Sequence, residues 1–113
     1  MLKQEVLRYQ KDFNRIYAKG RSAGDRYVVV FALKNGKSYT RHAFLASKKV
    51  GNSVRRNRAR RLMKEALRLS DMKLPDGYDF VIIARNTISE AKCSQVRKSL
   101  ESAIRKTGVL KKK

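Results

Sequence analysis

The side chains best suited to chemistry in this sequence are the cations between Lys48 and Lys64. Eight lysines or arginines and no carboxylate occupy this stretch: Lys48, Lys49, Arg55, Arg56, Arg58, Arg60, Arg61 and Lys64. The first arginines fall at the start of an expected helix, where each cation opposes the unpaired N–H groups and costs about 0.3–1 kcal/mol. A polyanion lying there removes this penalty, because N–H groups and cations then face the same phosphates. The pattern therefore predicts an RNA-binding surface.

An ordinary solvated face is the alternative explanation for these cations. Solvated helix faces usually mix charges through Glu–Lys pairs four residues apart, whereas Glu65 is the only acid between Lys48 and Leu69. Arginine also predominates over lysine here, and its guanidinium group can make bidentate hydrogen bonds to phosphate. RNA binding is therefore the favoured interpretation. The Asn57 amide can donate to phosphate or ribose, or Asn57 can be a polar surface residue without a function.

The composition indicates one basic globular domain over residues 1–113. The chain carries 29 lysines and arginines against 9 acids, a net charge of +20, and 42% of its residues are hydrophobic. This charge favours a nucleic-acid partner over an anionic membrane or an acidic protein, and no apolar run approaches the roughly 20 residues that span a bilayer. The lone Cys93 cannot form an internal disulfide and needs no role. We expect a cytoplasmic protein with no membrane contact.

No catalytic or metal-binding constellation is apparent in the sequence. A metal-dependent protein nuclease needs clustered carboxylates, and the nine acids are scattered from Glu5 to Glu101. His42 has no second His or Cys at a metal-ligand spacing, so it is expected on the surface or partly buried. We therefore expect no catalytic residue, no metal site and no cofactor held by the protein itself.

The elements that must position these residues alternate between helical and extended patterns. A helix is expected from about Tyr9 to Lys19, with Gly20 as a left-handed cap. The apolar run Tyr27–Leu33 predicts a buried strand, and Asn35-Gly36 predicts a hairpin turn into an antiparallel strand at Tyr39–Ala46. The basic helix, capped by Asn52 or Ser53, should run to about Leu69. A strand at Tyr78–Ala84 and a helix at about Glu90–Lys106 follow, the latter ending near Gly108.

This order, αββαβα, predicts an α+β fold with helices packed on one side of a small mixed sheet. The second strand, the basic helix and the third strand form a β-α-β unit whose strands can lie parallel. General handedness rules favour a right-handed crossover. On the basic helix, five residues should share the buried face: Ala59, Leu62, Met63, Ala66 and Leu69.

Several segments resemble the protein subunit of bacterial ribonuclease P. They are residues 13–20 (Phe-Asn-Arg-Ile-Tyr-Ala-Lys-Gly), then Arg41, the run from Lys48 to Arg61, and the strand Tyr78–Arg85. The resemblance follows nearly the whole chain in order. It implies a ribosomal-protein-like fold with a left-handed β-α-β crossover, in place of the right-handed default. The low-complexity lysines at the end of the sequence separately predict a disordered basic tail over about residues 110–113.

The resemblance also implies a function. In this family a catalytic RNA, with Mg²⁺, removes the 5′ leader of precursor tRNA, and the protein binds both that RNA and the leader. The protein alone is not expected to cleave RNA or to need a protein partner. Contacts to the catalytic RNA are implied for Lys48, Lys49, Gly51, Asn52, Arg55, Arg56, Asn57, Arg58, Arg60, Arg61, Lys64 and Arg68.

A central cleft for the leader is implied to contain Phe13, Tyr17 and Arg41. Helical spacing alone places Phe13 and Tyr17 in the core, whereas the resemblance favours a platform on which unpaired bases stack. Two other classes of protein remain as alternatives. One is a structural RNA-binding protein that ignores the leader, and the other is a self-sufficient nuclease, which the scattered acids disfavour.

Overall fold

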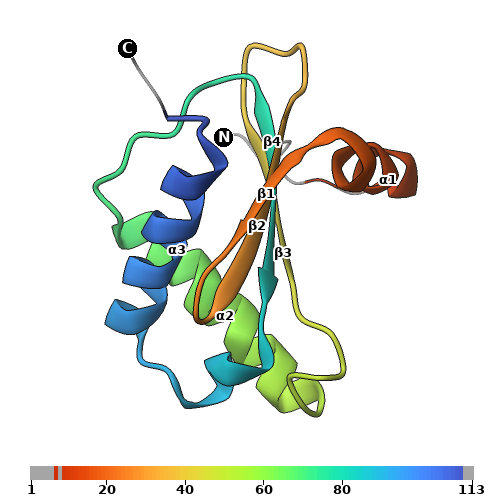
Figure 1. Ribbon diagram of the computed structural model, residues 1–113. Helices are drawn as coiled ribbons and strands as arrows, with labels where there is room; N and C mark the ends of the chain where they lie inside the picture. The colour runs from red at the N-terminus through yellow and green to blue at the C-terminus, as the bar shows by residue number, and fades with distance from the viewer. Residues whose placement is uncertain (1–6, 8, 111–113) are drawn as a thin grey trace.

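A four-stranded mixed sheet forms the centre of the molecule, with helices on both of its faces (Figure 1). The computed structural model describes residue 7 and residues 9–110. The predicted α+β class is confirmed, and the six predicted elements occur in the predicted order, with β1 and η2 in addition. Along the chain the elements are α1 (Gln10–Lys19), β1 (Arg21–Gly24), β2 (Val28–Lys34), β3 (Arg41–Leu45), α2 (Ser53–Leu69), β4 (Tyr78–Ala84), the 3₁₀ helix η2 (Asn86–Glu90) and α3 (Cys93–Thr107).

The strand order β1-β2-β4-β3 makes β4 the central partner of the sheet. β4 pairs with β2 antiparallel and with β3 parallel, so the predicted parallel β-α-β unit is confirmed. The hand of this crossover stays the prediction that the resemblance gives. The predicted hairpin between β2 and β3 is wrong, because β4 lies between these strands. Asn35-Gly36 marks a turn, with φ of 74° at Gly36, but a turn signal does not fix which strands pair.

β1 is a short edge strand that the sequence analysis missed. It pairs antiparallel with β2, from Arg21 opposite Ala32 to Gly24 opposite Val29. Its residues are mostly exposed, so they show no apolar alternation. The left-handed cap predicted at Gly20 is also wrong, because its φ is −75°. A Cβ on Gly20 would lie 2.6 Å from the Ile16 carbonyl oxygen and 2.9 Å from that of Ala32, so glycine permits a close turn from α1 into β1.

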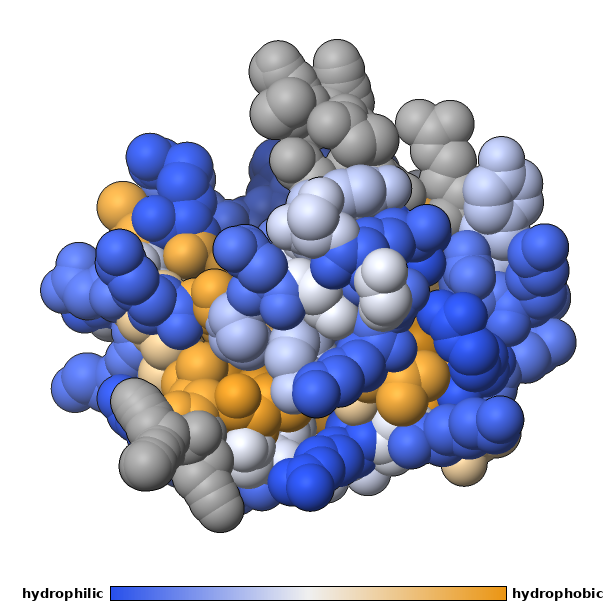
Figure 2. Space-filling view, turned by 90° about the horizontal axis from the view of Figure 1, so that it is seen from above, coloured by the Kyte–Doolittle hydropathy of each residue, from blue (hydrophilic) through white to orange (hydrophobic). Residues whose placement is uncertain are grey.

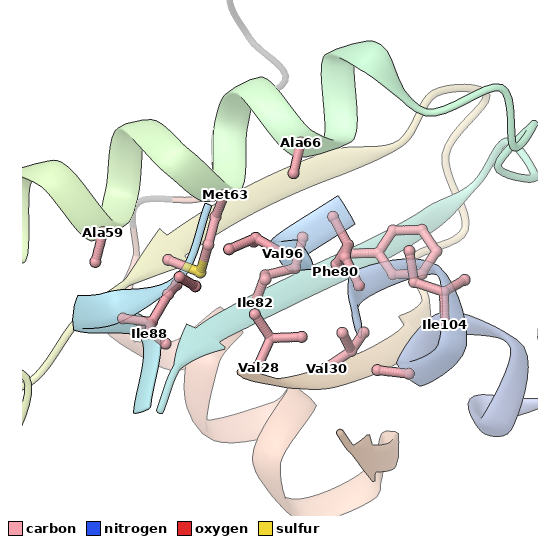
Figure 3. Packing of buried hydrophobic residues seen from close by; sticks show 14 of the residues in the cluster. Val28, Val30, Ala59, Met63, Ala66, Phe80, Ile82, Ile88, Val96 and Ile104 are labelled. Atoms are coloured by element: carbon pink, nitrogen blue, oxygen red, sulfur yellow. The ribbon is translucent and has the colours of Figure 1, made fainter. Parts of the chain in front are cut away.

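The main core lies between one face of the sheet and helices α2 and α3 (Figures 1 and 3). Ala59, Met63 and Ala66 of α2 point toward the sheet, where Phe80 and Ile82 of β4 meet them (Figure 3). These α2 residues confirm most of the predicted buried face. The predicted buried face is wrong at its edges, because Leu62 is only partly buried and Leu69 is 47% exposed.

Helix α1 packs on the opposite face of the sheet (Figure 1). The prediction that all helices lie on one side is therefore wrong. A second, smaller core forms there from Leu7, Ile16, Ala43 and Val81. Because side chains alternate along a strand, neighbouring residues of β3 and β4 supply the two cores. The strands thus connect two separate surfaces of the molecule.

The C-terminal part of the fold matches the prediction except at its start. Residues 86–90 form η2, so α3 begins at Cys93 rather than near Glu90. Gly108 has φ of 84° and ends α3 in the predicted left-handed conformation. Leu110 packs against the main core, so the expected tail does not begin there, and residues 111–113 lie outside the described residues. Within the described part of the chain, no helix is long and apolar enough to cross a membrane.

Candidate nucleic-acid interface

The start of α2 combines a capped helix terminus with a concentration of cations. The Asn52 side chain accepts a hydrogen bond from the Arg55 backbone N–H at 3.0 Å, which confirms it as the cap. Gly51, with φ of 142°, turns the chain into the helix. No acid lies in the first turn of α2. The unpaired N–H groups and the arginines therefore produce positive potential in the same place.

We call the exposed cations around this helix start the basic face. It consists of Lys48 and Lys49 in the preceding turn and of Arg55, Arg58, Arg61, Lys64 and Arg68 on α2, all of which are exposed. Asn57 is exposed among them, whereas Arg56 and Arg60 are half-buried. The structure thus brings the predicted RNA-contacting residues to one end and one side of α2.

Internal contacts of these side chains leave most of their charge without an acidic partner. Arg56 donates to the Gly51 carbonyl at 2.9 Å, and Arg60 donates to Asn57 Oδ1 at 2.7 Å. Arg58 donates to two backbone carbonyls beside η2, at 3.1 and 3.2 Å. Among the described residues, only Arg68 of this face pairs with an acid, Glu65. Arg68 is therefore the weakest of the predicted phosphate contacts.

The second predicted site lies across the sheet, on the side covered by α1. Phe13 and Tyr17 lie one turn apart on α1 with ring centroids 6.4 Å apart, and Tyr17 meets Phe31 of β2 edge-on at 5.1 Å. Tyr17 is 42% exposed and Phe13 is half-buried. Burial raises the pKa of Tyr17, so its phenol stays protonated at neutral pH.

Half-buried apolar residues extend this aromatic surface over the sheet. Leu45 of β3 is paired with Ile83 of β4, and both pack, like Phe31, against the smaller core on the α1 side. We call Phe13, Tyr17, Phe31, Leu45 and Ile83 the aromatic face. Sequence reasoning missed Phe31. Because side chains alternate along β2, Phe31 points to the face of the sheet opposite to that of the buried Val30. Figure 2, which shows the molecule from above, illustrates that hydrophilic residues cover most of the surface and that hydrophobic ones emerge in separate patches.

Asp79 anchors α1 to the sheet, and the sequence analysis did not single it out. Its side chain is 0% exposed and accepts four hydrogen bonds. Arg41 donates two of them at 2.8 and 2.7 Å, Arg15 of α1 donates one at 3.0 Å, and Asn35 donates one at 2.9 Å. Asp12 adds a second carboxylate, 3.6 Å from each arginine.

These contacts determine the charge states of the cluster. Burial alone would raise the pKa of Asp79, but the hydrogen bonds from Arg41, Asn35 and Arg15 outweigh it and hold the pKa below its ordinary value. The same hydrogen bond from Arg41 to Asp79 raises the pKa of Arg41. Asp79 is therefore a charged, paired carboxylate at neutral pH.

Arg41 lies at this cluster rather than at an open surface. Its side chain is only 12% exposed, and its guanidinium is directed at Asp79. The resemblance implied that Arg41 lines the leader cleft. That role stays a prediction. In the structure the Arg41 side chain pairs with Asp79 at the sheet edge beside α1, whereas Tyr17 is exposed and Phe13 is half-buried.

The described residues contain no group of three or more His, Cys, Asp or Glu side chains that could hold a metal ion. His42 is half-buried and stacks against Phe44 and Phe80, with centroids 6.2 Å away in each case. This packing agrees with the expected part-buried position.

Comparison with known proteins identifies the family. The Ribonuclease P sequence family matches residues 1–108. The "Ribonuclease P protein component" of Pelotomaculum thermopropionicum is 41% identical over 105 residues, which are 93% of this chain and 94% of that protein. The chain belongs to the bacterial ribonuclease P protein family. The corresponding protein of Clostridioides difficile is 40% identical over 104 residues, 91% of each chain.

Solved structures of ribonuclease P proteins share the fold. The Staphylococcus aureus protein superposes with a TM-score of 0.82 at 30% identity, over 95% of this chain and 98% of that one. The Thermotoga maritima protein gives 0.76 at 33% identity, over 87% and 93%. Membership of this family assigns the chain to tRNA 5′ processing as a partner of the ribonuclease P RNA.

Proposed function

We propose that this ribonuclease P protein docks on the catalytic RNA through the basic face and receives the 5′ leader of precursor tRNA on the aromatic face. The RNA and its Mg²⁺ ions then carry out the cleavage, and the protein supplies no reacting group. We place this activity in the cytoplasm, where precursor tRNA is made.

The arrangement of the two faces carries this proposal. The basic face lies on α2, on one side of the sheet, and the aromatic face lies beside α1 on the other (Figure 1). A large folded RNA needs many phosphate contacts, which unpaired arginines and a helix start provide. A single strand needs exposed rings on which bases can stack, and Tyr17 with Phe13 provides these. One chain can therefore bind both RNAs at once.

The decisive experiment compares leader lengths in the reconstituted enzyme. Phe13→Ala with Tyr17→Ala should weaken the affinity for a precursor with a leader of several nucleotides by about 5- to 150-fold, equivalent to the loss of one stacked base. Affinity for a precursor with a one-nucleotide leader should not change, because that leader does not reach the aromatic face. Tyr39→Ala removes an exposed ring from a loop and serves as the matched control.

Two results would contradict the proposal. If the double variant weakens both substrates equally, the rings contribute to folding or docking rather than to leader binding. If neither substrate is affected while the protein still binds the catalytic RNA, the chain acts as a structural RNA-binding protein. Cleavage by protein purified free of RNA would instead indicate a nuclease of its own.

A further inference from the structure

A groove between α2 and the first residue of α3 contains an apolar surface, which contacts to phosphate do not require. Its volume is about 560 Å³. Leu62 and Cys93 form its apolar part, and both are half-buried side chains that pack against the main core. Four cations surround this part: Arg58, Arg61, Lys64 and Arg68. The groove therefore joins an apolar surface to a positive rim.

The rim keeps most of its charge, because it contains one acid. Glu65 pairs with Arg68, and this contact lowers the pKa of Glu65. Arg58 is held by backbone carbonyls, which leave its charge uncompensated. Arg61 and Lys64 make no hydrogen bond or ion pair within the described part of the chain. They are thus the two rim cations most available to an outside anion.

The helix geometry places the apolar part beside the row of outward cations. Arg58, Leu62 and Glu65 follow one another on one flank of α2, at spacings of four and three residues. Arg61, Lys64 and Arg68 follow one another on the outer side of the helix, at spacings of three and four residues. A phosphate chain lying along the outer row would therefore have the groove directly beside it.

This combination of an apolar floor and a cationic rim selects the occupant. A nucleotide has a flat base for the floor and a phosphate for the rim, and arginine side chains can also stack on a base. A second copy of this chain is disfavoured, because two molecules of charge +20 repel each other. Purely apolar ligands would leave the rim cations unsatisfied.

We propose that this groove receives one unstacked nucleotide of the ribonuclease P RNA. Its base lies against Leu62 and Cys93, and its phosphate contacts Arg61 and Lys64. The inference rests on the proposed docking of α2 on that RNA, and it adds a site for a single base to a surface otherwise suited to phosphates.

Cys93 provides a probe, because it is the chain's single cysteine. The rate of its alkylation by N-ethylmaleimide is measured on the whole protein, free and saturated with the cognate ribonuclease P RNA transcript. We expect at least a tenfold slower reaction in the complex and no protection by poly-glutamate at equal charge concentration. An unchanged rate in the complex overturns the proposal, and so does protection by poly-glutamate alone, which would indicate an acidic peptide site.

A second measurement separates base binding from simple coverage by RNA. Protein already alkylated at Cys93 should bind the RNA about 5- to 150-fold more weakly, as expected for one lost stacked base. The dependence of affinity on salt should stay the same, because the number of phosphate contacts does not change. The matched control carries Cys93→Ser with Ser94→Cys, which moves the same adduct to an exposed neighbour. It should bind as the unmodified protein does.

The outcomes also separate this site from the proposed function. Alkylated protein that binds RNA with full affinity overturns the groove assignment, and stimulation of precursor cleavage then still supports the function. Unmodified protein that fails to bind the RNA at all removes both.

Discussion

Replacing Asp79 by asparagine should destabilise the fold and displace α1. Asparagine has the same shape, but its amide group would face the N–H groups of Arg41 and Arg15, which now donate to Oδ2. Removing one partner of a buried charged cluster costs about 3–5 kcal/mol. We expect the lower end, about 3 kcal/mol, because the Arg15 side chain is 38% exposed and can turn to water. For a domain of this size, the melting temperature should fall by about 12 °C.

Thermal denaturation followed by circular dichroism at pH 7 measures this change. Asp76→Asn is the control, since it removes an equal charge from an exposed position in the preceding turn and should change stability by less than about 0.5 kcal/mol. Below its melting temperature, the Asp79 variant should lose affinity for a long leader more than affinity for the catalytic RNA, because α1 carries Phe13 and Tyr17. A loss of less than about 1 kcal/mol would refute the view that Asp79 fixes α1 to the sheet.

Three further predictions test other parts of the structure. Arg61→Ala should reduce the salt slope of binding to the catalytic RNA by about 0.7–0.9, as expected for one lost phosphate contact, and titration of affinity against salt measures this. The pKa of Asp79 is depressed in the folded state, so its carboxylate stabilises the fold above a pH of about 4 and loses this effect as pH falls through the folded pKa. The melting temperature of the natural protein should therefore drop more steeply in acid than that of Asp79→Asn. Gly20→Ala should cost about 1–3 kcal/mol, since its Cβ would lie 2.6 Å from a carbonyl oxygen, whereas in denaturant titrations Gly24→Ala should be tolerated, with its nearest neighbour at 3.4 Å.

Elements with strong periodicity were predictable from the sequence, and pairing between distant strands was not. β4 and α2 have the expected bounds, because a continuous apolar run and a capped amphipathic pattern are local signals. The pairing of β2 with β4 depends on which buried strand occupies the centre of the sheet, and no short-range sequence signal specifies this. β1 was missed since an exposed, short edge strand lacks alternation.

The two candidate sites differ in how far the sequence could indicate them. The basic face was visible, because its cations are adjacent on one helix and lack acidic neighbours. The cluster around Asp79 joins residues 15, 35, 41 and 79, which only the fold brings together. The sequence therefore could not indicate that Arg41, predicted to line the leader cleft, pairs with the buried carboxylate of Asp79.

Strand β3 contributes side chains to both faces of the sheet, which is one backbone layer thick. Ala43 and Leu45 face α1, while the alternating residues His42 and Phe44 face the main core on the side of α2. Consecutive residues thus point to opposite faces of the sheet. A single residue inserted in β3 would turn every side chain that follows it to the other face. Under the proposed function, one layer of backbone therefore sets the distance between the ribonuclease P RNA on the α2 side and the precursor leader on the α1 side.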